Sequence, residues 1–140
     1  MAKKFVGPSK VLFCTDGSKC AEEAIRFGGE IIKGMDCTSM ILNVTPWITD
    51  ASERLAEDIA KQGVQILRNL GIDASAKTIL GKEVAEEILK EADEGNFDLI
   101  VAGSRGLSGI PRFLLGSTTL KLINQTSQPI LVYKRHRRNK

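Results

Sequence analysis

The feature that most constrains the fold is a regular alternation of short apolar runs with helical patterns. The apolar runs occupy residues 11–15, 40–45, 74–80, 99–102 and 130–133. They are continuous rather than alternating, which is typical of strands covered on both faces, although Ser75, Lys77 and Thr78 dilute the third run. Each run is therefore predicted to be a strand of a buried sheet.

The segments between these runs repeat apolar residues at helical spacing. The second helical pattern, for example, places Leu55, Ile59 and Leu67 on one stripe. The patterns end near residues that stop helices, namely Gly34, Gly71, Gly95 and Pro129. The order βαβαβαβαβ predicts an α/β fold, a single doubly wound five-stranded parallel sheet with helices on both faces.

Composition agrees with one globular domain and assigns the positive charge to one end. The chain has 140 residues, 42% hydrophobic and 26% charged, which excludes a disordered chain or a small cysteine scaffold. The net charge is +3, but residues 134–140 carry five Lys or Arg, and without them 15 basic side chains face 17 acidic ones. We therefore expect a domain over residues 1–134 and a basic tail over residues 135–140. Such a tail is usually a solvated end, so we do not expect nucleic-acid binding.

Histidine and cysteine usage excludes several kinds of active site. The one histidine, His136, lies in the basic tail, so neither a Ser-His-Asp triad nor a multi-histidine metal site is expected. Cys14, Cys20 and Cys37 form no CxxC pair, and Cys14 is expected in the core. No apolar run approaches the roughly 20 residues that cross a bilayer, and no secretory segment follows Met1, so we expect a cytoplasmic protein without membrane contact.

Two segments that follow predicted strands carry the functional information, because ligands of such sheets bind beyond the carboxyl ends of strands. Thr15-Asp16-Gly17-Ser18 follows the first run. A glycine-rich loop follows the fourth run at Gly103-Ser104-Arg105-Gly106 and reaches Gly116-Ser117-Thr118, where the fourth helix opens.

This loop has the chemistry of an anion site. Glycines let backbone N–H groups approach a ligand, and a helix N-terminus attracts negative charge. Arg105 and Arg112 add positive charge, and Asp16 can accept hydrogen bonds from a ribose or base. The alternative is that the glycines only shape a long turn and that Ser117 only caps its helix. Neither GxxxxGK[ST] nor GxGxxG after the first strand is present.

These residues resemble the universal stress proteins. That family's nucleotide signature, G-x2-G-x9-G-[ST], reads here Gly103-x2-Gly106-x9-Gly116-Ser117. The first strand with its Asp-Gly-Ser end and the last strand, Gln128-Pro129-Ile130-Leu131-Val132, are also similar to family members. The resemblance extends over the whole chain.

The resemblance implies an adenine-nucleotide alpha-hydrolase-like fold with strand order 3-2-1-4-5 and ATP bound by the signature, with AMP or ADP as alternatives. It assigns adenosine contacts to Thr15, Asp16 and the backbone of Val44. It assigns the start of the phosphate cradle to Gly103, Arg105 and Gly106, and its phosphate end to Gly116, Ser117 and Thr118. Val44 could instead be only a core residue, and Arg105 only a solvated one. Mg²⁺ or Mn²⁺ would be held through the phosphates rather than by a metal site of the protein.

The predicted function is that of an ATP-binding universal stress protein, a nucleotide-dependent switch or slow ATPase in the stress response. No residue is predicted to be catalytic, because no general base is placed to activate water. The family also implies a homodimer through the last strand, Ile130–Tyr133, which would otherwise be an apolar edge that the tail alone shields. The alternative is a dimeric protein-interaction module with a vestigial nucleotide pocket.

Overall fold

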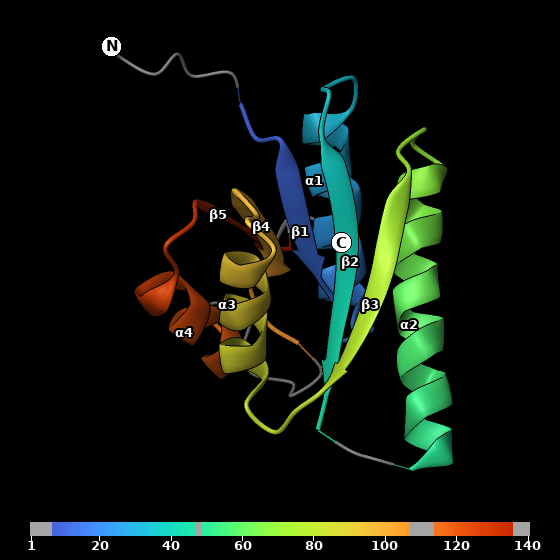
Figure 1. The fold of residues 1–140 in the computed structure, drawn as a ribbon, viewed down its shortest axis with the longest axis vertical. Helices are drawn as coiled ribbons and strands as arrows, with labels where there is room; N and C mark the ends of the chain where they lie inside the picture. The colour runs from blue at the N-terminus through green and yellow to red at the C-terminus, as the bar shows by residue number, and fades with distance from the viewer. Residues whose placement is uncertain (1–6, 47–48, 107–113, 136–140) are drawn as a thin grey trace.

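The computed structural model describes residues 7–46, 49–106 and 114–135 of the chain. Five strands alternate with four helices, as the sequence predicted (Figure 1). In chain order the elements are β1 (Lys10–Cys14), α1 (Lys19–Ile32), β2 (Thr38–Thr45), α2 (Asp50–Arg68), β3 (Ala74–Leu80), α3 (Val84–Glu94), β4 (Leu99–Gly103), α4 (Ser117–Gln125) and β5 (Ile130–Tyr133). Predicted and observed strands differ by at most two residues at an end.

All strand pairs in the sheet are parallel, and the strand order is β3-β2-β1-β4-β5. This confirms the predicted fold class and order. Val11 of β1 lies opposite Ser39 of β2 on one side and Leu99 of β4 on the other. The chain thus winds outward from β1 to β3, crosses back to β4 and continues to β5. The winding reverses between β1 and β4, so their carboxyl ends flank the switch point.

The helices cover both faces of the sheet, and a separate core lies under each pair (Figure 1). Under α1 and α2, side chains such as Phe13, Ile25 and Leu67 are buried. Under α3 and α4, Leu12, Ile88 and Leu122 are buried. Consecutive residues of β1 therefore enter opposite cores, which explains why its sequence is continuously apolar.

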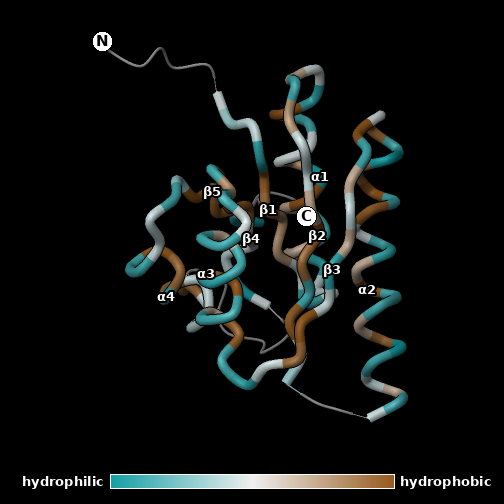
Figure 2. The backbone as a smooth tube through the Cα atoms, viewed as in Figure 1, coloured by the Kyte–Doolittle hydropathy of each residue, from teal (hydrophilic) through white to brown (hydrophobic). Residues whose placement is uncertain are grey.

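The buried face of α2 differs from the predicted stripe. Leu55 is 61% exposed, whereas Ala56, Ala60, Gly63 and Leu67 are buried. A Cβ on Gly63 would lie 2.8 Å from Ile41 Cγ2, so small residues let the helix approach the sheet closely. Figure 2 shows the resulting alternation of hydrophilic and hydrophobic segments along α2. Counting large apolar residues missed this face because its contact surface is made mainly of alanine and glycine.

The two edge strands also differ from the prediction of strands covered on both faces. In β3, Ser75, Ala76 and Lys77 are exposed, which agrees with the polar residues that dilute this run. Every residue of β5 is partly exposed. An edge strand has a neighbour on one side only, so its side chains are less completely covered than those of β1 or β4.

At the amino ends of β1 and β4, the carboxylate of Asp98 accepts hydrogen bonds from Ser9 and Lys10. The Ser9 N–H lies 3.0 Å from Oδ2, the Ser9 hydroxyl 2.9 Å from Oδ2, and the Lys10 N–H 3.1 Å from Oδ1. Burial alone would raise the pKa of Asp98, but these hydrogen bonds outweigh it and lower the pKa. Within the described residues, no helix is long and apolar enough to span a bilayer.

Candidate functional site

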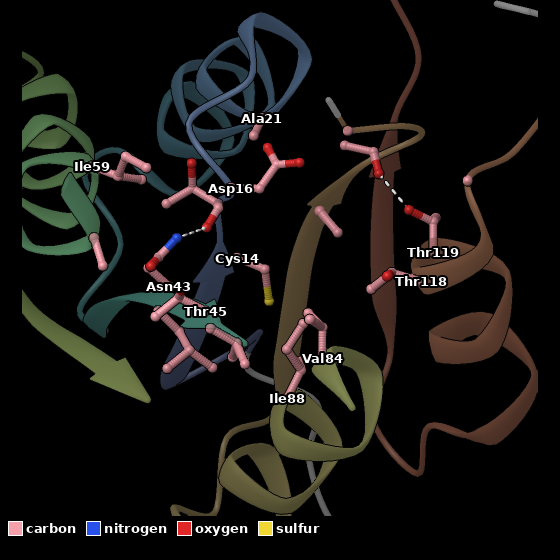
Figure 3. A pocket seen from close by; sticks show the side chains of 18 of the residues that line it. Cys14, Asp16, Ala21, Asn43, Thr45, Ile59, Val84, Ile88, Thr118 and Thr119 are labelled. Carbon is pink, nitrogen blue, oxygen red and sulfur yellow. Dashed lines mark hydrogen bonds between the residues drawn. The ribbon is translucent and has the colours of Figure 1, made fainter. Parts of the chain in front are cut away.

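A cavity of about 690 Å³ opens at the carboxyl ends of β1, β2 and β4, where the winding of the sheet reverses. We call it the switch-point cavity. Its volume lies within the range of roughly 300–1,000 Å³ that is typical of small-molecule sites. The lining includes all nine residues to which the family resemblance assigned a nucleotide contact, namely Thr15, Asp16, Val44, Gly103, Arg105, Gly106, Gly116, Ser117 and Thr118. Figure 3 shows this cavity between the first strand and the last helix.

The turn after β1 is fixed by hydrogen bonds of its own. The Gly17 N–H donates to Thr15 Oγ1 at 3.1 Å, and the Ser18 N–H donates to Asp16 Oδ1 at 2.9 Å. Gly17 has φ +85°, a conformation that favours glycine. Ser18 then caps α1 by accepting from the Ala21 N–H at 3.2 Å. These bonds hold the Asp16 carboxylate at the cavity, half-buried.

The start of the glycine-rich loop packs directly against this turn. A Cβ added to Gly106 would overlap Asp16 Oδ2, so only glycine fits without movement of the carboxylate. A Cβ added to Gly103 would lie 3.2 Å from backbone atoms of Cys20 at the start of α1. A side chain at either glycine would therefore have to displace a neighbour, the start of α1 for Gly103 and the Asp16 carboxylate for Gly106.

The second part of the loop opens α4 toward the cavity. Gly116 is the N-cap, no side chain caps the helix, and Ser117 is its first residue. The reading of Ser117 as a cap is therefore wrong. The first N–H groups of a helix have no acceptor within it, so those of Ser117 and Thr118 offer donors and a positive dipole end at this wall of the cavity. The Thr119 hydroxyl donates to Gly103 O at 2.8 Å and fixes the helix against β4.

The backbone N–H and C=O of Ser104 link the edge strand β5 to the N-terminus of α4. The Ser104 N–H donates to Tyr133 O at 2.8 Å, and Ser104 O accepts from the Gly116 N–H at 2.7 Å. Ser104 is 1% exposed. One buried residue therefore spans the distance between β5 and the N-terminus of α4.

Apolar side chains line the rest of the switch-point cavity, and most of them were not predicted as site residues. They come from α2, α3 and the end of β2: Pro46, Leu55, Ile59, Val84 and Ile88. Leu55 belongs to the apolar stripe of the second helical pattern. Helical spacing alone does not distinguish a residue that is buried in the core from one that is exposed at a cavity. These side chains give the cavity a surface that suits a flat, weakly polar group such as a nucleobase.

Asn43 is a further lining residue that sequence reasoning missed. It is 3% exposed, and its Nδ2 donates to Thr15 O at 2.8 Å, the dashed line beside Asn43 in Figure 3. Its Oδ1 is buried and has no hydrogen-bond partner among the described residues. An amide inside the apolar run at 40–45 was the signal that could have identified it.

Two observations bear on what chemistry the switch-point cavity can support. Burial raises the pKa of the Cys14 thiol to about 12, so this lining residue stays protonated near neutral pH and is a poor nucleophile. Within residues 7–46, 49–106 and 114–135, no group of three or more His, Cys, Asp or Glu could hold a metal ion. Gly109, Arg112, His136 and the tail from residue 136 lie outside the described residues.

Comparison with known proteins gives similar chains and similar folds. Universal stress protein YxiE of Bacillus subtilis is 28% identical over 146 residues, which cover 90% of this chain and 99% of YxiE. A crystal structure of a universal stress protein in complex with cAMP matches with a TM-score of 0.77 at 20% identity, covering 94% of this chain and 100% of the other. The universal stress protein from Archaeoglobus fulgidus in complex with dAMP matches with a TM-score of 0.75 at 24% identity, covering 93% and 100%.

The family assignment depends on a match along nearly the whole chain. The model of the universal stress protein family matches residues 8–134, which include every strand and helix of the sheet described above. The chain therefore belongs to the universal stress protein family.

Proposed function

We propose that the chain binds ATP in the switch-point cavity and acts in the cytoplasm as a nucleotide-dependent switch or slow ATPase in the stress response. The observation that carries this proposal is the meeting of three features at one cavity: the Asp16 turn, the glycines of the loop and the N-terminus of α4. A carboxylate suits ribose hydroxyls, and the helix N-terminus suits phosphate.

Each end of a nucleotide has a matching wall in this proposal. The adenine would contact the backbone of Val44 and the apolar side chains of Leu55 and Ile59, and the ribose would lie at Thr15 and Asp16. The phosphates would lie between Gly103, Arg105 and Gly106 and the segment Gly116, Ser117 and Thr118. The similar structures that contain dAMP and cAMP support an adenine nucleotide as the ligand class. AMP and ADP are weaker alternatives to ATP.

A divalent ion would enter with the phosphates. Asp16 is the carboxylate that lines the cavity, and its Oδ1 already accepts from the Ser18 N–H. The donors present therefore fit Mg²⁺ or Mn²⁺ held mainly by phosphate oxygens, with Asp16 as its neighbour. The ion would neutralise phosphate charge.

Binding is favoured over turnover in this proposal because activation of water needs a general base. The Cys14 thiol is protonated, and Asp16 is already engaged by the turn that carries it. Hydrolysis, where it occurs, is expected to be slow. A role as a switch requires only that the occupied and empty proteins differ in what they bind.

Isothermal titration calorimetry tests the proposal with ATP, ADP and AMP, each with and without Mg²⁺. We expect saturable binding of ATP with a Kd near the micromolar range, about −8 kcal/mol. Gly116→Val should abolish it, because branched carbons would stand between the helix N–H groups and the phosphates. An absence of binding heat for all the nucleotides with protein in the tens of micromolar would refute the proposal.

A second candidate is a dimeric protein-interaction module whose pocket is vestigial, and the apolar edge strand favours it. β5 lies at the end of the sheet, and the ring of its Tyr133 packs 5.3 Å from the ring of Phe27, which is 47% exposed on α1. We propose that this edge forms a homodimer whether or not nucleotide binds. Purification of the native protein decides between the two candidates. The interaction module is favoured if the purified protein is a dimer without bound nucleotide and if the Gly116→Val variant still supports survival under stress.

A further inference from the structure

Asn43 stands where an apolar side chain would be the ordinary choice. It lies on the same face of β2 as Ile41, toward α1 and α2, and is 3% exposed. Its Oδ1 has no partner among the described residues, and a buried acceptor without a partner opposes folding. Packing alone therefore does not favour asparagine here over leucine.

The hydrogen bond that Asn43 makes reaches a sensitive point of the chain. Its Nδ2 donates to Thr15 O at 2.8 Å. The pairing register of β1 with β2 ends with Cys14 opposite Leu42, and the Thr15 N–H still donates to Leu42 O at 3.0 Å. Asn43 thus adds a side-chain contact across the strands just where β1 ends and the Asp16 turn begins.

The carbonyl that Asn43 holds belongs to the peptide between Thr15 and Asp16. Fixing that oxygen fixes the plane of the peptide, and with it the direction in which the Asp16 side chain leaves the backbone. The carboxylate has little room, because its Oδ2 packs against Gly106. In Figure 3 the Asn43 amide lies on the β2 side of the turn and Asp16 on the side toward the glycine-rich loop.

We propose that Asn43 is a positioning residue, whose Nδ2 holds the Thr15 carbonyl and so orients Asp16 for the nucleotide. Its effect on binding rests on the proposed function, but its effect on the turn does not. The Oδ1 atom is inaccessible to solvent and Nδ2 already donates to Thr15, so the polar atoms of Asn43 act on the turn rather than on the ligand.

The test compares Asn43→Leu with Ser39→Ala. Ser39 is a matched control, because it lies on β2 on the same face, is 6% exposed and also has an unpartnered buried oxygen, but at the other end of the strand. Hydrogen exchange of the Gly17 and Ser18 amides, which donate within the turn, reports on the turn without any nucleotide. We expect exchange at both amides at least tenfold faster in Asn43→Leu, and no change in Ser39→Ala.

Calorimetry then measures ATP binding of the same proteins. We expect the Kd of Asn43→Leu to rise about tenfold, because the Thr15 carbonyl loses its donor and the turn no longer holds Asp16 in place. Asn43→Asp, with nearly the same shape but an oxygen in place of the donating NH2, should behave similarly and serves if the leucine variant does not fold. Unchanged exchange at Gly17 and Ser18 would overturn the proposal, and so would faster exchange with an unchanged Kd. If the wild type binds no nucleotide, the proposed function fails and exchange alone decides whether Asn43 positions the turn.

Discussion

At the residue scale, the glycines of the signature serve different physical purposes. Gly106 leaves room for the Asp16 carboxylate, since a Cβ there would overlap Oδ2. Among the described residues, a Cβ on Gly116 would have nothing nearer than 3.4 Å, an ordinary contact, at the Cα of Arg105. Gly106 therefore lets the Asp16 carboxylate keep its place in the protein itself. Gly116 has room for a methyl group within the part of the chain that the structure describes, so we ascribe its small size to the approach of a ligand.

Gly106→Ala should weaken ATP binding because the added methyl group displaces the Asp16 carboxylate. We expect a rise in Kd of tenfold or more, about 1.4 kcal/mol, measured by calorimetry. In an Asp16→Ala background the same substitution should raise the Kd for ATP little further, because the oxygen that the methyl group would overlap is gone. Equal losses in both backgrounds would show that the methyl group acts on something other than Asp16.

Gly116→Ala should separate stability from binding. Because its methyl group meets only ordinary contacts among residues 7–46, 49–106 and 114–135, the urea midpoint without nucleotide should stay close to that of the wild type. ATP affinity should nevertheless fall, because the methyl group projects where phosphate oxygens would approach the backbone. A Gly116→Ala protein that binds ATP as tightly as the wild type would contradict this assignment.

At the element scale, the open edge of the sheet follows from the pairing of β5. The Ile100 N–H donates to Pro129 O at 3.0 Å, and the Ser104 N–H donates to Tyr133 O at 2.8 Å. Alternate residues of a strand bond to the same neighbour, so the N–H groups of Ile130 and Val132 point away from β4. These groups are the ones that a second copy of the strand could pair with.

Val132→Pro should therefore prevent the proposed dimer without breaking the pairing with β4. Proline removes the outward N–H and is tolerated at edge strands when its missing donor faces outward. Light scattering after size exclusion should give a monomer for Val132→Pro and a dimer for the control Val132→Thr, which keeps the N–H. A dimeric proline variant would place the interface elsewhere.

The contact of Asp98 with the start of β1 predicts a pH dependence of stability. The folded pKa of Asp98 is lowered, so its contribution is complete above the unfolded pKa of about 4 and is lost as pH falls through the folded value. Asp98→Ala should unfold at lower urea than the wild type at pH 7. The difference should shrink below about pH 4. A constant difference from pH 7 to pH 3 would exclude the carboxylate as its source.

At the same scale, the sequence predicted element types better than buried faces. The strands and helices appear where apolar runs and stop residues placed them, because burial and helix termination leave strong local patterns. Leu55 belongs to the predicted apolar stripe of α2 and is exposed, since the close approach of α2 to the sheet depends on Ala56, Ala60 and Gly63. A count of apolar periodicity is dominated by large side chains. How closely a helix can approach a sheet is decided by its small residues, alanine and glycine.

At the scale of the whole molecule, the strand order brings distant parts of the sequence to one cavity. The site residues Thr15 and Gly116 are about 100 positions apart but line the same space. Sequence could place Thr15 at the end of a strand and Gly116 at the start of a helix, and resemblance to the family supplied the strand order that joins them. Neither the sequence nor the resemblance could identify the role of Asn43, because that role depends on which carbonyl at the end of β1 lies opposite its amide.

Nucleotide should stabilise the whole fold if it binds only the folded state. At a free ATP concentration of 100 times the Kd, the expected gain is about 2.7 kcal/mol, which raises the melting temperature of a domain this size by several degrees. Differential scanning fluorimetry with ATP and, as a control, inorganic triphosphate measures it. A shift with triphosphate as large as that with ATP would argue against recognition of the adenosine part.

The reversal of winding between β1 and β4 has a consequence for how the protein could be taken apart. Three strands of the sheet, β1 to β3, come from the chain before α3, and two, β4 and β5, from the chain after it. The switch-point cavity straddles the seam, with Asp16 on one side and Gly106 on the other. A nucleotide in the cavity would contact both parts of the sheet and hold them together. Two fragments separated by a cut between β3 and α3 would then reassemble more readily when it is present, which would make the fold a candidate for a split reporter of its own ligand.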